Sequence, residues 1–185
     1  MENVCEVKKI DGEEWIVFND SFNEELSPQI IDLISRYQKV QFGDDFYQQI
    51  DNLPSSITHL QFGSESFFNQ TIDNLPPSLE FLQLGIHFNQ PINNLPNSLK
   101  ELRILGIFNY PVDYLPNSLE RLKLGWFFNQ PLDNLPNSLK FLEMGEDFDQ
   151  PINNLPSSLE EISVYKTYQH KLPDNIVVKK YSKKN

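Results

Sequence analysis

Phe88-Asn89-Gln90-Pro91-Ile92-Asn93-Asn94-Leu95-Pro96-Asn97-Ser98-Leu99 is the most regular copy of a phrase that recurs along this chain. Its opening phenylalanine returns at positions 68, 88, 108, 128 and 148, so the period is 20 residues. A fixed period of this length predicts a solenoid, in which each turn of chain stacks on the one before. Such a molecule presents a long, repeated surface to its surroundings.

Each phrase leads into a short segment with the pattern of a strand. In Leu79-Glu80-Phe81-Leu82-Gln83-Leu84, the leucines at 82 and 84 alternate with Phe81 and Gln83, which is a period of two. The spacing Leu-x-x-Leu-x-Leu is the leucine-rich-repeat pattern. We therefore predict a leucine-rich-repeat solenoid with short parallel strands on a concave sheet. Its rungs have about 20 residues, an extended or 3₁₀ convex side and little helix.

The other repeated residues are interpreted as structural. Six apolar positions in each rung are expected to point inward, as in Leu79, Leu82, Leu84, Phe88, Ile92 and Leu95. Glycines let the chain turn off each strand, at Gly43, Gly63, Gly85, Gly106, Gly125 and Gly145. Asparagines are expected to bond the backbone of the neighbouring turn, at Asn69, Asn89, Asn109 and Asn129. The repeated serines beside the strand starts have no His-Asp pair, so they are not predicted to be nucleophiles.

Three segments follow from this pattern. Residues 1–14 are predicted to form a capping hairpin that turns at Asp11-Gly12, and residues 15–165 hold the repeats. Ser27 followed by Pro28 predicts one short capped helix within them. Residues 166–185 are predicted to form a degenerate cap and a basic tail that frays from Tyr181 onward.

Composition excludes several classes of function. The chain has 185 residues and a net charge of −11, and its acidic body is unsuited to binding nucleic acid. Cys5 is the only cysteine, and no apolar run resembles a signal peptide or a membrane span, so we predict an intracellular protein with no membrane association. Its three histidines are dispersed, so we predict no metal site. Because the sequence also shows no His-Asp pair beside its serines and no phosphate-binding glycine loop, we predict no cofactor and no enzyme activity.

The repeated phrase resembles the FNIP (IP22) repeat family, named for its Phe-Asn-Ile-Pro form. The resemblance covers roughly residues 18–165. It implies a leucine-rich-repeat fold and an origin in amoebae or in giant viruses that infect them, with the host cytoplasm as location and a host protein as partner. Many viral members are similar to F-box proteins, which implies a substrate adaptor of a ubiquitin ligase as an alternative function. Residues 1–45 predict a hairpin and one short helix, whereas an F-box needs several helices.

The leading prediction is a non-enzymatic module that binds a protein partner on the concave sheet. The outward residues vary from rung to rung, and Phe81 and Phe141 flank a basic cluster of Arg103, Arg121 and Lys123. Aromatic and arginine side chains are the usual anchors of interfaces, so an acidic, partly apolar surface is expected there. The predicted binding residues are Trp15, Lys39, His59, Phe81, Gln83, Glu101, Arg103, Arg121, Lys123, Phe141 and Glu143. The alternative interpretation is a solvated sheet with ordinary cross-strand pairs such as Glu101–Arg121.

A further hypothesis is self-association, as a homodimer or a structural assembly. Tyr110 and Tyr114 replace polar residues of the other copies, and Trp126 and Phe127 stand where other rungs carry polar residues. Exposed aromatic groups of this kind predict a contact patch. The alternative is sequence drift, with the rings folded onto a neighbouring rung.

Overall fold

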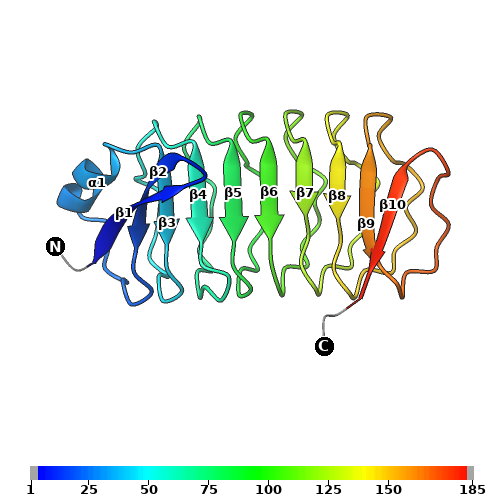
Figure 1. Ribbon diagram of the computed structural model, residues 1–185, viewed down its shortest axis with the longest axis horizontal. Helices are drawn as coiled ribbons and strands as arrows, with labels where there is room; N and C mark the ends of the chain where they lie inside the picture. The colour runs from blue at the N-terminus through cyan, green and yellow to red at the C-terminus, as the bar shows by residue number, and fades with distance from the viewer. Residues whose placement is uncertain (1–3, 183–185) are drawn as a thin grey trace.

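Ten strands lie side by side in one sheet, in chain order from β1 to β10, in this computed structural model (Figure 1). The structure describes residues 4–182, so predictions for residues 1–3 and 183–185 lie outside it. The first elements are β1 (Cys5–Ile10), β2 (Glu13–Phe18), helix α1 (Pro28–Ile34), β3 (Lys39–Phe42), β4 (His59–Phe62) and β5 (Phe81–Leu84). The others are β6 (Glu101–Ile104), β7 (Arg121–Lys123), β8 (Phe141–Glu143), β9 (Glu161–Tyr165) and β10 (Val177–Tyr181).

The strands from β2 to β10 are parallel, and each is joined to the next by one turn of the solenoid. Pairing is in register, so Leu82 stands between Leu60 and Leu102 on neighbouring strands. The return segments are extended and broken by turns, with no 3₁₀ segment assigned in residues 4–182. The predicted leucine-rich-repeat solenoid is therefore confirmed. Of the two predicted conformations of its convex side, extended or 3₁₀, the structure has the extended one.

A column of aromatic rings runs through the core. Its members are buried, and neighbouring ring centroids lie 5.8–6.4 Å apart. The column consists of Phe22, Phe46, Phe68, Phe88, Phe108, Phe128, Phe148 and Tyr168. Five of the six predicted inward positions are buried in the rung of Leu79, but Leu95 is only partly buried, because it lies at the corner before Pro96.

Side-chain ladders hold the turns together where no strands pair. The backbone N–H of Asn89 donates to Oδ1 of Asn69 at 2.8 Å, and Asn129 donates likewise to Asn109 at 2.9 Å. The hydroxyl of Ser118 donates to the carbonyl oxygen of Leu99 at 2.7 Å. These bonds satisfy backbone groups that the sheet leaves free, and they confirm the structural roles predicted for the asparagines and serines.

The two ends of the solenoid differ. β1 pairs with β2 in an antiparallel hairpin, and its turn holds Asp11 and Gly12 at positive φ, as a tight hairpin turn requires. Helix α1 begins after Ser27, whose side chain accepts a bond from the N–H of Ile30, so the predicted capped helix is confirmed. The prediction that Tyr181 frays is wrong: it belongs to β10, and its hydroxyl donates to the carbonyl oxygen of Met144.

One glycine departs from the predicted series. Ile104 pairs with Leu84, so Leu105 stands opposite Gly85, and Gly106 comes one residue later than expected. Gly106 also has φ of +70°, and a Cβ there would overlap the backbone of Ile86 on the neighbouring turn. The rung therefore has its glycine where the backbone adopts positive φ and approaches the neighbouring turn, and it places a leucine where other rungs have none.

Candidate functional site: a charged groove on the sheet face

The sheet face, meaning the outward side of β2 to β10, carries two rows of side chains set by the strand register. The first row consists of Trp15, Lys39, His59, Phe81, Glu101, Arg121, Phe141 and Glu161. The second consists of Val17, Gln41, Gln61, Gln83, Arg103, Lys123, Glu143 and Ser163. All eleven predicted binding residues therefore lie on one face, because residues at alternate positions of a strand share a side.

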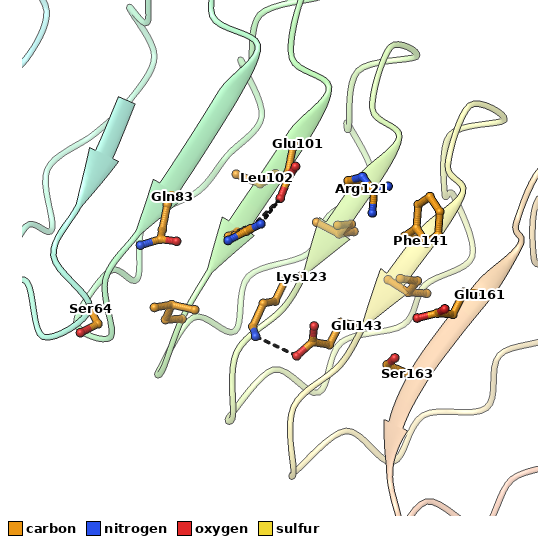
Figure 2. Close-up of a pocket in the computed structure, with 14 residues that line it drawn as sticks. Ser64, Gln83, Glu101, Leu102, Arg121, Lys123, Phe141, Glu143, Glu161 and Ser163 are labelled. Carbon is orange, nitrogen blue, oxygen red and sulfur yellow. Dashed lines mark hydrogen bonds and ion pairs between the residues drawn. The ribbon is translucent and has the colours of Figure 1, made fainter. Parts of the chain in front are cut away.

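A groove of about 550 Å³ runs over the middle of this face (Figure 2). Its lining includes seven of the predicted residues: Gln83, Glu101, Arg103, Arg121, Lys123, Phe141 and Glu143. It also includes Ser64, Glu161 and Ser163, which lie at its margins and were not predicted to bind a partner. We call this cavity the groove.

Two of its three cations are neutralised by carboxylates of the same face. Arg103 pairs with Glu101 on its own strand at 2.6 Å, and Lys123 pairs with Glu143 on the next strand at 2.8 Å (Figure 2). The guanidinium of Arg103 also lies over Phe81, 5.4 Å from the ring centroid. The cross-strand pair Glu101–Arg121 is not formed, because Arg103 occupies Glu101.

Arg121 is the exception. Its guanidinium lies over the ring of Phe141, with Cζ 3.8 Å from the ring centroid, and it forms none of the salt bridges found among the described residues. The side chain is exposed, so its N–H donors face solvent. A guanidinium that is oriented by a ring and free of carboxylates is prepared to bind a carboxylate of another molecule.

The predicted binding residues at the N-terminal end of the face pack against one another. Trp15 is 7% exposed, with Lys39 over its ring and His59 at its edge. His59 in turn stacks on Phe81 with a centroid distance of 5.7 Å. Trp15 therefore offers little surface to a partner, and its main contribution is to pack this end of the sheet.

His59 gives the face a dependence on pH. Burial, assisted by the positive charge of Lys39, lowers the pKa of His59 below its ordinary value of 6.5. The unfolded chain then binds a proton more readily than the folded chain as the pH falls through 6.5. Stability is expected to decrease over that range, and His59→Gln is expected to remove this part of the slope. Urea unfolding between pH 7.5 and pH 5 checks this, and an unchanged slope in the variant would contradict it.

The four aromatic residues predicted for self-association do not form one patch. Tyr114 is 70% exposed and stands in a polar groove lined by asparagines of the return turns, whereas Trp126 and Phe127 follow the end of β7. Tyr110 leans on Phe108, with a centroid distance of 6.4 Å. The interpretation of folded-back rings therefore suits Tyr110 better than Tyr114.

Phe127 is not the only exposed apolar residue at its position of the described rungs, and the others were not predicted from the sequence. Phe67 and Ile107 occupy the same position of earlier rungs and are 55% and 41% exposed, and Phe67 stacks on His87 at 4.8 Å. We call Phe67, His87, Ile107 and Phe127 the ridge. The sequence does contain a signal for the ridge, since each of its residues comes immediately before a core phenylalanine.

Some kinds of site are not found in the part of the chain that is described. Residues 4–182 contain no group of three or more histidine, cysteine and acidic side chains arranged to hold a metal ion. None of their helices has the length and apolar character needed to cross a membrane. Both observations concern the described residues alone.

The strand register, the repeated core and the asparagine ladder together define a leucine-rich-repeat solenoid. The model of the FNIP Repeat family matches residues 38–65, 68–106, 108–147 and 128–166, and the chain belongs to this family. It is also similar to a solved structure, that of CroV588, described as a novel circular LRR protein, with a TM-score of 0.76 and 28% identity. The match covers 95% of this chain but only 31% of that one. No curated protein matches this chain.

Proposed function

We propose that this protein is a non-enzymatic interaction module that holds a protein partner in the groove, with Arg121 as the central anchor. The observation that supports the proposal is the free guanidinium of Arg121 on the ring of Phe141, whereas the other two cations of the groove have carboxylate partners of their own. A partner that supplies a carboxylate to Arg121 gains a bidentate bond without first breaking an ion pair. Membership of a repeat family is consistent with such a role.

The partner is expected to be acidic and partly apolar. The ring of Phe141 and the stem of Arg121 supply apolar surface, and the guanidinium supplies the charge. The chain as a whole is acidic, with 26 Asp and Glu against 15 Lys and Arg. The groove is lined by three cations and three carboxylates, so the attraction for an acidic partner comes from the guanidinium of Arg121, which has no carboxylate of its own among the described residues.

The test is selection of peptide ligands from a random library on the purified protein, followed by affinity measurements on two matched variants. Arg121→Gln is expected to weaken the selected ligands about 10-fold to 30-fold. Arg103→Gln removes the same group from a neighbouring position that is already paired, and we expect a smaller loss. Equal losses, or ligands without acidic residues, would refute Arg121 as the anchor.

Self-association has one observation in its favour, the ridge, in which Phe67, Ile107 and Phe127 are exposed apolar side chains and the half-buried His87 stacks on Phe67. If it occurs, the mass in solution should rise with concentration and return to that of the monomer in the double variant Phe67→Ser/Phe127→Ser. A monomer at every concentration would remove this second candidate. The ubiquitin-ligase adaptor and the host cytoplasm stay predictions from the family resemblance.

A further inference from the structure

A second cavity adjoins the groove at the carboxyl ends of the strands. It has a volume of about 260 Å³, and four residues that line it also line the groove: Ser64, Leu105, Lys123 and Glu143. We call this cavity the notch. Its volume is below the range of roughly 300–1,000 Å³ that holds a drug-sized ligand, so it has room for about one side chain.

The notch is created by departures from the repeat. Leu105, Gly125, Gly145 and Tyr165 stand in one row across four strands, at the position after the last inward residue of each strand. The two glycines have a packing reason, because a Cβ at either position would overlap the backbone of the previous turn. Leucine and tyrosine replace that glycine on either side, and they wall a gap of about 14 Å, which is three strand spacings.

Two packed tyrosine rings form the wall of the notch nearest the C-terminal end of the sheet. Tyr181 continues the row on β10 and packs against Tyr165 with a centroid distance of 4.3 Å. Its hydroxyl donates to the carbonyl oxygen of Met144, which holds the ring in position. Burial strongly raises the pKa of this hydroxyl, so it stays protonated and able to donate. Trp126, which is 52% exposed, also lines the notch.

We infer that the notch binds one aromatic side chain of the partner whose carboxylate binds Arg121. The ion pair of Lys123 with Glu143 lies where the two cavities meet, so one extended segment can occupy both. The row of the notch lies four residues beyond Arg121 along the strand direction, about 13 Å at 3.3 Å per residue. An extended partner segment therefore places its acidic and aromatic residues four positions apart. The identity of the partner rests on the proposed function, whereas the pocket itself does not.

The first experiment uses indole as the probe and the full chain as the protein. Titration with indole is expected to shift the methyl resonances of Ile86 and Leu105, which line the notch, with a dissociation constant in the millimolar range. Trp126→Ala and Phe127→Ala form a matched pair, because both side chains are 52% exposed and only Trp126 lines the notch. We expect about fivefold weaker binding in the first and no change in the second. No shifts at these methyl groups, or equal weakening in both variants, would overturn the inference.

The second experiment uses two peptides, acetyl-Glu-Ser-Thr-Ser-Trp-amide and acetyl-Trp-Ser-Thr-Ser-Glu-amide, since the direction of the segment is open. One of them is expected to bind more tightly than indole and to lose affinity in both Trp126→Ala and Arg121→Gln. If the affinity for the peptide decreases in Trp126→Ala but not in Arg121→Gln, the notch is supported as a binding site and the proposed role of Arg121 in the groove is refuted. If indole itself fails to bind, the inferred aromatic pocket is refuted, and the test of Arg121 with selected ligands is unaffected.

Discussion

Replacing Phe128 with alanine is expected to lower the free energy of unfolding by about 3–5 kcal/mol, measured by urea denaturation. The ring is fully buried and stacks between Phe108 and Phe148, with centroid distances of 6.1 Å on both sides. Its removal opens a cavity between two turns and takes away a neighbour from each of two other rings. In a solenoid the turns are stabilised mainly by their neighbours, so the damage falls on three rungs rather than one.

The neighbouring residue supplies the control. Phe127 is also phenylalanine but is 52% exposed, and Phe127→Ala is expected to change stability by less than about 0.5 kcal/mol. Phe128→Leu keeps most of the buried volume and should lie between the two. If Phe128→Ala and Phe127→Ala prove equally stable, the column of rings is not a main source of cohesion in this fold.

The second large effect is expected at Gly106, where alanine should cost about 2–5 kcal/mol of stability. Two separate causes act there. The backbone has φ of +70°, which residues with a Cβ rarely adopt, and the added methyl group overlaps the carbonyl oxygen and Cα of Ile86. Relief of that overlap requires the turn after β6 to move away from the turn after β5.

Gly12 separates the two causes. It also has positive φ, +83°, but no atom lies within 4 Å of the position that a Cβ would take. Gly12→Ala therefore reports the backbone cost alone, about 1–2 kcal/mol. The difference between the two variants measures the close approach of the turns, and a difference near zero would show that the solenoid relaxes around the added methyl group without cost.

The framework of this molecule could be read from its sequence because each of its determinants is local and repeated. The spacing of Leu79, Leu82 and Leu84 sets the inward side of a strand, and the step of 20 residues places each phenylalanine over the previous one. The fold, the sheet face and the ladder of asparagines follow from these spacings. Individual exceptions, such as the displaced Gly106 or the ordered Tyr181, depend on contacts with a neighbouring turn.

The groove was predictable as a surface but not as a set of contacts. The period of two puts Glu101, Arg103 and Arg121 on one face, yet it does not say which cation takes the carboxylate. In the structure Arg103 reaches Glu101 on its own strand, and Arg121 lies on Phe141 instead. That choice depends on side-chain conformations and distances across strands, which have no signature in the spacing.

By itself, the sequence determined that this protein is a stack of rungs with a repeated core and one variable face, because apolar residues recur at the same inward positions of every rung. Only the tertiary structure decided that Arg121 is left without a carboxylate, that Trp15 is covered by its neighbours, and that a notch exists at the strand ends. The walls of the notch come from Leu105, Trp126, Tyr165 and Tyr181, which lie on different turns and meet only when the register of the strands brings them together.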